Sequence, residues 1–318
     1  MLDSNKHQFN HLKIHTQYSI CEGAIKIDEL KDYCKENKIR SIGLCDTANL
    51  CGALEFAEKI SKSGSQPIIG TQINFQFEDT IGLLPLFALN ENGYKKIIEL
   101  SSLSYLKNDA ISEPHLLFEE LLEDLSGVSI FSGTINGFFG KLFNKGKFPE
   151  IKNFYKKLKS KFDDSFYLEI QRHGDDNEIG FEKFNLACSL ELEIPLIATN
   201  EVFYMQKDMH EAHDALICIG NKTYVNDKNR LKFSNQHYFK NNSEMLELFA
   251  DIPEALENNY NFPMRCNFKP LFSKPILPNI SSEKGGEANE ILRKESLDGL
   301  ILKFKKVFNI EENQLINN

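Results

Sequence analysis

Long apolar runs are missing from this sequence of 318 residues, since none approaches the roughly 20 positions that a membrane-spanning helix needs. The first residues, Met1–Gln8, contain neither an apolar stretch nor small residues of the kind found at a cleavage site, so we expect no signal peptide. With 41% hydrophobic and 26% charged residues, 10 prolines and 18 glycines, the composition is that of an ordinary soluble globular protein. We therefore expect a cytoplasmic protein without a membrane partner.

The sequence has no Cys-x-x-Cys pair, although it contains seven cysteines. An odd number of scattered cysteines in a chain of this length favours reduced, mostly buried thiols over a disulfide framework. A nucleophilic role for one of these thiols is the less favoured alternative. The seven positions are Cys21, Cys34, Cys45, Cys51, Cys188, Cys218 and Cys266.

An excess of positive charge is also missing, because 37 lysines and arginines face 46 aspartates and glutamates, for a net charge of −9. An acidic chain repels the phosphate backbone, so this chain by itself is expected to bind nucleic acid poorly. The longest basic run, Tyr155–Lys161, has its lysines at helical spacing. It indicates a solvated helix face rather than a patch for nucleic acid.

Short apolar segments alternate with amphipathic ones about seven times, which predicts a mainly parallel sheet with helices outside it. No Asn-Gly or similar signal indicates a hairpin, so we expect an α/β fold closed into a (β/α) barrel. An open doubly wound sheet is the alternative, but no Gly-x-Gly-x-x-Gly follows the first strand. The predicted strands are His11–Thr16, Ser41–Cys45, Pro67–Phe75, Leu83–Leu89, Val128–Ser132, Phe166–Gln171 and Pro195–Thr199. The predicted helices are Ile27–Asn37, Leu50–Ser63, Glu91–Leu106, His115–Glu123, Phe148–Lys161, Glu178–Glu193 and Lys207–Ile219.

The pattern changes near residue 220. Ser243–Phe249 predicts a short helix with Ser243 as its N-cap, and Ile252–Leu256 begins another one. Three prolines within Lys269–Ser282 predict an extended linker. Gly285–Phe308 then predicts a helix whose apolar face little remaining chain could cover, which we interpret as the incomplete start of a second domain.

Polar residues cluster at the C-terminal ends of the predicted strands, where (β/α) barrels carry their chemistry. This ordering indicates an ancestral site, although polar residues also mark ordinary strand ends and turns. The residues are His15, Asp46, Gln72, Thr134, His173 and Glu201.

Several sequence motifs occur in the same order as in one known family. They are His11–Ser19, Cys45–Gly52, Pro67–Gly70, Gly93-Tyr94, Glu169–Gly174, Ala198–Asn200, Glu211–Cys218, Leu248–Leu256 and Arg265-Cys266. Over nearly the whole chain they resemble the polymerase-and-histidinol-phosphatase (PHP) domain at the N-terminus of bacterial DNA polymerase III alpha subunits, of the proteobacterial type. The resemblance implies a distorted seven-stranded (β/α) barrel followed by a short, incomplete helical segment that stops before the catalytic residues of the palm.

Active PHP domains hold about three metal ions through nine side chains. The ions activate water and clamp a phosphate ester. Carried over by resemblance, two of these positions keep a ligand, His15 and Glu22, and Glu201 is a conservative change. The first histidine of the family's His-x-His falls on Lys13, whose ammonium has no lone pair for a metal. The other replaced positions are Thr47, Gln72, Leu83, Thr134 and Phe203.

Three remaining ligands cannot assemble a three-metal site, so we expect a degenerate site with no bound metal. One weak metal site through His15, Glu22 and Glu201 is the alternative. We further expect the charge of Lys13 to stand in for a metal by pairing with Glu22 or Glu201, because buried carboxylates without a cation are costly.

Two other candidates are weighed against ordinary packing. His210 and His213 lie three apart on a predicted helix and could share a metal, but a packed helix is favoured because no third ligand lies nearby in sequence. Asp163-Asp164 precedes a barrel strand, so it is not the acidic pair of a polymerase.

The resemblance also implies a function. Residues 1–268 would be the PHP domain, and residues 269–318 the linker and start of the palm region, of a replicative DNA-directed DNA polymerase, a nucleotidyltransferase. This chain alone would be a non-catalytic scaffold that docks the proofreading exonuclease subunit within the holoenzyme. It would reach DNA only through polymerase domains outside this chain, which use magnesium. The alternatives are a metal-dependent, histidinol-phosphatase-like phosphoesterase and a free-standing adaptor for replication proteins.

Overall fold

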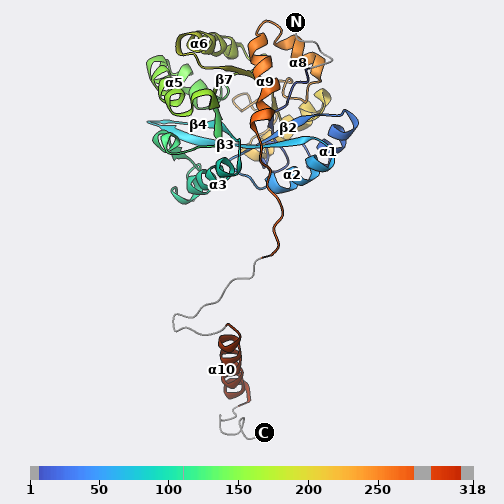
Figure 1. Ribbon diagram of the computed structural model, residues 1–318, viewed down its shortest axis with the longest axis vertical. Coiled ribbons are helices and arrows are strands. Elements are labelled where there is room, and N and C mark those ends of the chain that lie inside the picture. Colours follow the sequence, from blue (N-terminus) through green and yellow to red (C-terminus); the bar gives the residue numbers. More distant parts are fainter. Residues whose placement is uncertain (1–6, 110, 276–287, 309–318) are drawn as a thin grey trace. The chain divides into compact units, whose positions relative to one another are not determined.

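A computed structural model describes residues 7–109, 111–275 and 288–308 of the chain. It divides into two units, Met1–Leu271 and Phe272–Asn318, which are described separately. The first unit is built on one curled sheet with helices around its outside (Figure 1). None of the helices in the described residues is both long and apolar enough to cross a membrane.

The sheet has nine strands, of which eight follow the order β8-β7-β6-β4-β3-β2-β1-β9 and β5 pairs with β3 beside this path. Every pair along the path is parallel except the two that β4 makes with β3 and β6. The strands are β1 (Lys13–Ile14), β2 (Ser41–Thr47), β3 (Gln66–Phe77), β4 (Thr80–Ala88), β5 (Leu116–Leu117), β6 (Val128–Phe131), β7 (Phe166–Ile170), β8 (Leu196–Ala198) and β9 (Glu201–Val202).

The two ends of this path, β8 and β9, are consecutive in the chain and are separated only by Thr199 and Asn200. β8 pairs with β7, and β9 pairs with β1 on the other side. Counted as one interrupted strand, β8 and β9 therefore join the sheet into a ring of seven strands. The predicted distorted (β/α) barrel is confirmed, and the interruption at Thr199 and Asn200 is its seam.

One hairpin was not expected from the sequence. β3 and β4 form a long antiparallel pair in which Phe77 is opposite Thr80, and only Glu78 and Asp79 connect them. Glu78 takes a left-handed backbone conformation with φ of +51°, which favours glycine or asparagine. The prediction of no hairpin was wrong because this turn uses residues that carry no turn signature.

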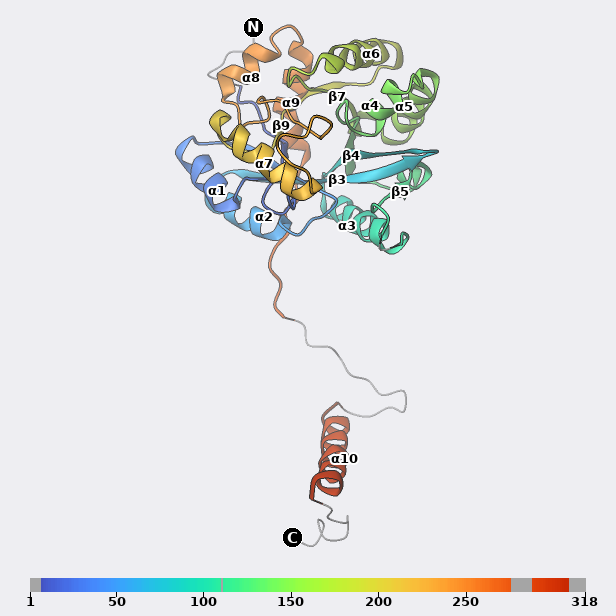
Figure 2. The same cartoon turned by 180° about the vertical axis from the view of Figure 1, so that it is seen from behind.

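The helices lie around the outside of the sheet (Figures 1 and 2). α9 lies towards the viewer in Figure 1 and α7 in Figure 2, so these two helices lie on opposite sides of the barrel. The helices of this unit are α1 (Ile27–Glu36), α2 (Ala53–Lys62), α3 (Glu91–Leu106), α4 (Phe138–Asn144), α5 (Phe148–Phe162), α6 (Asp176–Leu192), α7 (His210–Asn221), α8 (Asn242–Leu248) and α9 (Pro253–Arg265).

Two local predictions were wrong. The helix expected at His115–Glu123 is instead the short strand β5 followed by a 3-10 turn, Phe118–Leu122, because β5 pairs with β3. The N-cap of α8 is Asn241 and not Ser243, since the Asn241 side chain accepts a hydrogen bond from the Glu244 N–H. Helix α4 was not predicted at all.

The apolar core has three parts, and one of them lies inside the curled sheet. The other two parts of the core lie between the helices and the outer surface of the sheet. In one of them, α1 buries Leu30 and α2 buries Phe56. The interior cluster takes one apolar residue from each of six successive strands and is closed by Phe262 of α9. Its six strand residues are Cys45, Ile68, Phe87, Phe131, Tyr167 and Ile197. One end of the barrel is therefore filled with packed rings.

All seven cysteines are free thiols and five of them are buried, as predicted. In the second unit, α10 (Ala288–Phe308) forms most of the helix predicted at Gly285–Phe308. Part of the predicted linker, 276–282, lies outside the described residues. Leu292, Leu297 and Leu300 of α10 are exposed within the described chain.

Asn259 of α9 is fully buried and makes a reciprocal amide clamp with Asn10, which precedes β1. The Asn10 N–H donates to Asn259 Oδ1 at 2.8 Å, and Asn259 Nδ2 donates to the carbonyls of Asn10 at 2.9 Å and Ala198 at 3.0 Å. This clamp holds α9 against β8 and against the start of the barrel.

We predict that Asn259→Ala lowers the free energy of unfolding by about 2–4 kcal/mol, because it leaves several buried backbone groups unpaired. Urea denaturation followed by circular dichroism measures the change. Glu257→Ala, on an exposed position of the same helix, is the control and should change stability by less than about 0.5 kcal/mol. Equal stability of the two variants would contradict the clamp.

Candidate functional site: a buried charge cluster inside the barrel

Strand alternation brings the polar residues of the predicted site to the inner face of the sheet. Residues paired in register share a face, so Lys13 of β1 lies on the same side as Glu201 of β9. Glu169 of β7 is the register partner of Ile197, a member of the interior apolar cluster. A polar layer therefore lies next to the apolar layer inside the barrel.

Lys13 lies at the centre of this polar layer. Its Nζ is 3.1 Å from Glu201 Oε1 and 3.4 Å from Glu169 Oε1, and the side chains of Lys13 and Glu169 are fully buried. Burial by itself would lower the pKa of Lys13, but the charges of Glu169 and Glu201 raise it above its ordinary value. The expected pairing with Glu201 is present, whereas Glu169 takes the place that was expected for Glu22.

Glu201 connects three of the predicted positions through one oxygen. Besides Lys13, its Oε1 accepts a hydrogen bond from Gln72 Nε2 at 2.7 Å and lies 3.3 Å from His15 Nε2. Burial alone would raise the pKa of Glu201, but the charge of Lys13 and the hydrogen bond from His15 hold it well below its ordinary value. The same hydrogen bond, with the charge of Glu22, raises the pKa of His15 against the effect of burial.

Glu169 was missed as a site residue by the sequence analysis. Its Oε1 accepts hydrogen bonds from Gln171 Nε2 at 2.8 Å and from the Thr199 hydroxyl, which lies at the seam. The signal was a carboxylate in the middle of an otherwise apolar strand, Phe166–Ile170, all of which is buried. A buried acid within such a strand predicts a cationic partner.

Asp46 and Glu22 occupy the rim beside His15. Asp46 is buried and accepts hydrogen bonds from the Thr16 N–H at 2.6 Å and from Ser19 Oγ at 2.8 Å, and burial nevertheless raises its pKa. Glu22, whose side chain is 25% exposed, accepts from Thr47 Oγ1 at 2.5 Å and lies 3.8 Å from His15 Nδ1. Glu22 therefore belongs to the cluster but does not reach Lys13.

Apolar side chains occupy two further positions that the resemblance assigns to metal ligands. Phe203 is buried and packs on the His15 ring, with centroids 4.5 Å apart and planes tilted by 32°. Leu83 lies on β4 opposite Asn74 and is only partly buried. Neither side chain has an atom that can donate electrons to a metal.

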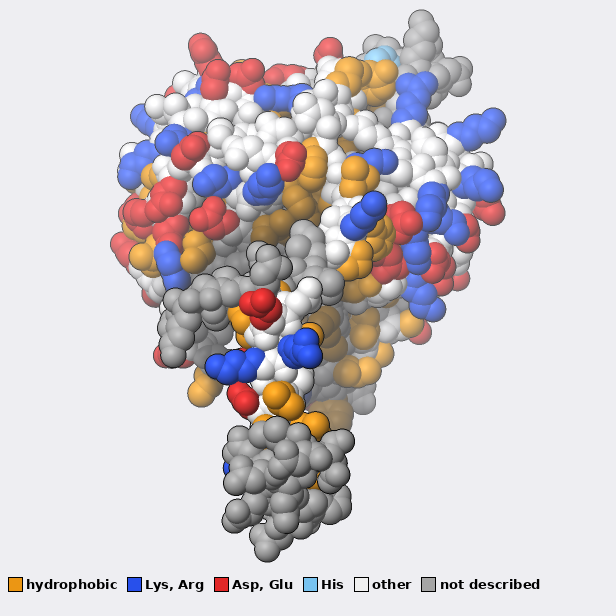
Figure 3. Space-filling model, turned by 60° about the horizontal axis from the view of Figure 1, so that its bottom comes forward, with side chains coloured by type: hydrophobic (Ala, Val, Ile, Leu, Met, Phe, Trp, Pro, Cys, Tyr) orange, Lys and Arg blue, Asp and Glu red, His pale blue; other side chains and the backbone are white. Residues whose placement is uncertain are grey.

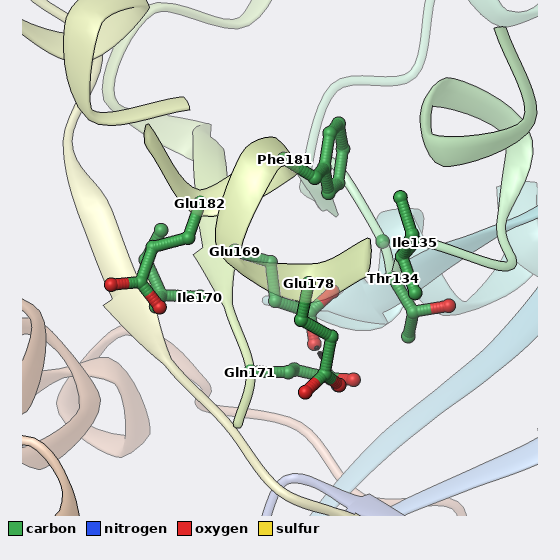
Figure 4. Close-up of a pocket in the computed structure, with 9 residues that line it drawn as sticks. Thr134, Ile135, Glu169, Ile170, Gln171, Glu178, Phe181 and Glu182 are labelled. Carbon is green, nitrogen blue, oxygen red and sulfur yellow. Dashed lines mark hydrogen bonds between the residues drawn. The ribbon is translucent and has the colours of Figure 1, made fainter. Parts of the chain in front are cut away.

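Thr134 lines a cavity with Glu169, Gln171 and Glu178 (Figure 4). The cavity has a volume of about 10 Å³, which is room for roughly one water molecule. Two buried oxygens of its lining, Glu169 Oε2 and Gln171 Oε1, have no hydrogen-bond partner among the described residues. The cavity is too small for a phosphate ester.

His173 and His237 stack face to face beside the cluster, with centroids 3.9 Å apart and planes at 5°. The Glu201 N–H donates to His173 Nε2, so the opposite nitrogen, 3.0 Å from Glu178 Oε1, carries the proton of a neutral ring. Burial lowers the pKa of His173 to about 3 and also lowers that of His237. Two stacked neutral rings avoid the repulsion of two imidazolium ions.

The histidine pair considered in the sequence, His210 and His213, does not converge on one point. His210 Nε2 lies 3.0 Å from the Phe233 carbonyl, and His213 Nε2 lies 2.9 Å from the Glu22 carbonyl. Each ring therefore has its own backbone partner, as the packed-helix alternative predicts.

The residues present do not fit the metal cluster that the resemblance implies. An ammonium lies within 3.1 Å of Glu201 Oε1, where a metal bound to this carboxylate would lie. Within the described residues, no group of three or more His, Cys, Asp or Glu side chains is arranged to hold a metal ion. Seven of the nine positions are joined by hydrogen bonds, ion pairs or ring contacts, and Thr134 lines a cavity with Glu169.

We predict that acidification from pH 7 to pH 5 destabilises the fold. His11, His173, His213 and His237 have lowered pKa values because they are buried, with that of His11 at about 4. Below about pH 6.5 these histidines take up protons only in the unfolded chain. Each of them therefore lowers the free energy of unfolding by up to roughly 1.4 kcal/mol for every pH unit of acidification. His15 has the opposite sign, since its raised pKa favours folding below about pH 6.5 and this contribution is lost at higher pH.

Urea denaturation at several pH values tests this dependence. His11→Gln keeps a donor for the Lys240 carbonyl and should reduce the slope between pH 5 and 6 by about one proton. His115→Gln, at a histidine outside the barrel interior, is the control and should leave the slope unchanged. An unchanged slope in His11→Gln would contradict the prediction.

The chain is similar to known proteins of one family. The family profile described as "PHP domain" matches residues 11–173. Among curated proteins, the chain is 36% identical over 311 residues to DNA polymerase III subunit alpha of Rickettsia conorii, covering 98% of this chain and 26% of that protein. It is 34% identical to the subunit of the same name from Caulobacter vibrioides, over 96% of this chain and 27% of that protein. The chain thus spans about a quarter of the length of these relatives.

Among solved structures, the chain matches a two-domain protein from Bacteroides vulgatus with a TM-score of 0.38 and 12% identity. That protein is described as containing a predicted PHP-like metal-dependent phosphoesterase. The match covers 76% of this chain and 62% of that protein. From the profile match and the identity to curated relatives, the chain belongs to the PHP domain family and is homologous to the N-terminal region of DNA polymerase III alpha subunits.

Proposed function

We propose that this chain is the N-terminal PHP region of a replicative DNA polymerase alpha subunit and acts there as a non-catalytic scaffold. Its alignment over 98% of its own length with 26% of the length of the alpha subunit of Rickettsia conorii supports this assignment. In the intact protein it would support the polymerase, dock the proofreading exonuclease subunit and belong to the replication holoenzyme. The assignment of residues 269–318 to the linker and start of the polymerase region is part of the same proposal.

The observation that carries the non-catalytic role is the ion pair of Lys13 with Glu201 in the barrel interior. Phosphoesterase chemistry on this fold needs divalent ions that activate water and neutralise the phosphate. Here a lysine occupies a ligand position, and Leu83 and Phe203 offer no donor atom at two others. We therefore propose that the chain holds no tightly bound metal and hydrolyses no phosphate ester.

Contact with DNA is assigned to polymerase domains outside this chain, together with their magnesium. The chain has a net charge of −9, and on the face shown in Figure 3 acidic and basic side chains are interspersed. Such a surface offers no extended positive field for a phosphate backbone.

The first experiment measures metal content and phosphatase activity together. After equilibration with zinc, manganese and magnesium and then desalting, elemental mass spectrometry should find less than one ion per chain. A generic phosphomonoester should not be hydrolysed above the rate without protein. Two or more ions per chain with hydrolysis would instead establish the alternative, a metal-dependent PHP-family phosphoesterase, and Glu201→Gln should then abolish both.

The second experiment tests docking. The purified chain and the proofreading exonuclease subunit of the same organism are mixed and analysed by sedimentation velocity. We expect a stable one-to-one complex, and an unrelated exonuclease of similar size serves as the control. Two separately sedimenting species at micromolar concentrations would contradict the docking role.

The reading frame downstream of Asn318 distinguishes the remaining alternative. A frame that continues into a palm domain supports the polymerase subunit. A stop codon directly after Asn318 would favour a free-standing adaptor for replication proteins.

A further inference from the structure

A fully buried lysine is rare, and Lys13 is one of the largest side chains in this barrel that solvent does not reach. Its Nζ lies 3.1 and 3.4 Å from two carboxylate oxygens, yet it makes no well-directed hydrogen bond among the described residues. The ammonium therefore interacts with Glu169 and Glu201 chiefly through its charge, as a small cation would.

The two carboxylates lie on opposite sides of the barrel seam. Glu201 is on β9, next to β1, whereas Glu169 is on β7, which pairs with β8. Only Thr199 and Asn200 connect β8 to β9, and the Thr199 hydroxyl also donates to Glu169. Lys13 thus attracts one carboxylate on each side of the seam, where the ring of strands is interrupted.

The charge balance of the interior depends on this residue. Glu169 and Glu201 are both buried, and Asp46 is buried nearby. Of these three carboxylates, His15 forms an ion pair with Glu201, at 3.3 Å, and it also lies 3.8 Å from Glu22. Without Lys13, Glu169 would have no cationic partner among its described contacts, and an unpaired buried carboxylate is strongly destabilising.

We propose that Lys13 is a built-in replacement for a bound cation, and that its removal opens a cation site formed by Glu169, Glu201 and His15. This site shares His15 and Glu201 with the nine positions that the family uses for metals, and it differs from the ancestral site by including Glu169. Carboxylate and imidazole ligands suit manganese. The stability of the barrel is measured separately from exonuclease docking, so a failure of one leaves the other in place.

The test uses the full chain and thermal unfolding. Lys13→Ala should unfold at a temperature roughly 5–15 °C lower than the wild type in the presence of a chelator. Millimolar manganese should recover at least half of this loss in Lys13→Ala, while sodium chloride of equal ionic strength should not. The wild type should show the same unfolding temperature with chelator and with manganese.

Four further variants make the result decisive. Lys62→Ala, which removes an exposed ion pair with Glu58, should behave as the wild type. Lys13→Ala combined with Glu201→Gln should lose the response to manganese. Lys13→Met with Glu201→Gln removes both charges of one pair and should be more stable than Lys13→Met alone, which keeps the test informative if Lys13→Ala does not fold.

Two outcomes would overturn the proposal. One is a Lys13→Ala chain that is as stable as the wild type in chelator, because the ammonium would then be dispensable. The other is an equal response of wild type and Lys13→Ala to manganese, because the ion would then bind elsewhere. Failure of Lys13→Met with Glu201→Gln to fold any better than Lys13→Met would also argue against charge balance as the reason for the lysine.

Discussion

The interior of this barrel depends on the attraction between the ammonium of Lys13 and the carboxylates of Glu169 and Glu201. Carboxylates lose their hydration when they are buried, and only a nearby positive charge with good hydrogen bonds offsets that cost. The first strand supplies the charge, and Gln72 and Thr199 supply hydrogen bonds to the same two oxygens. The seam of the barrel is therefore held by electrostatics on the inside and by backbone pairing on either side.

This cluster also bears on the chemistry of the chain. A site that activates water for phosphoester hydrolysis needs electron-pair donors arranged around open coordination positions. Here the ammonium of Lys13 and the ring of Phe203 against His15 occupy the corresponding space. The cavity that remains beside Thr134 has a volume of only about 10 Å³. The ammonium of Lys13 supplies positive charge to this interior without an ion, which agrees with a role in which the barrel serves as a rigid support.

Much of the fold could be predicted from the periodicity of the sequence. The predictions that were wrong have local causes. The alternation of apolar strands and amphipathic helices indicated the barrel, because period 2 and period 3.6 report directly which side chains are buried. The turn at Glu78 and Asp79 was missed because its left-handed residue is not glycine. The strand at Leu116 was missed because two residues show no periodicity, and only pairing with β3 makes them a strand.

The sequence by itself determined the family and the barrel class, since these are properties of residue type and order, and the resemblance predicted which residues replace metal ligands. It also indicated that Lys13 needs a buried carboxylate, because an ammonium inside a barrel must be paired. Glu201 was one of the two expected partners, and only the tertiary structure identified Glu169 as the other carboxylate beside Lys13. Glu169 lies 156 positions from Lys13 along the chain, and it becomes a partner only because the interrupted strand of β8 and β9 brings β7 and β1 to the two sides of one seam.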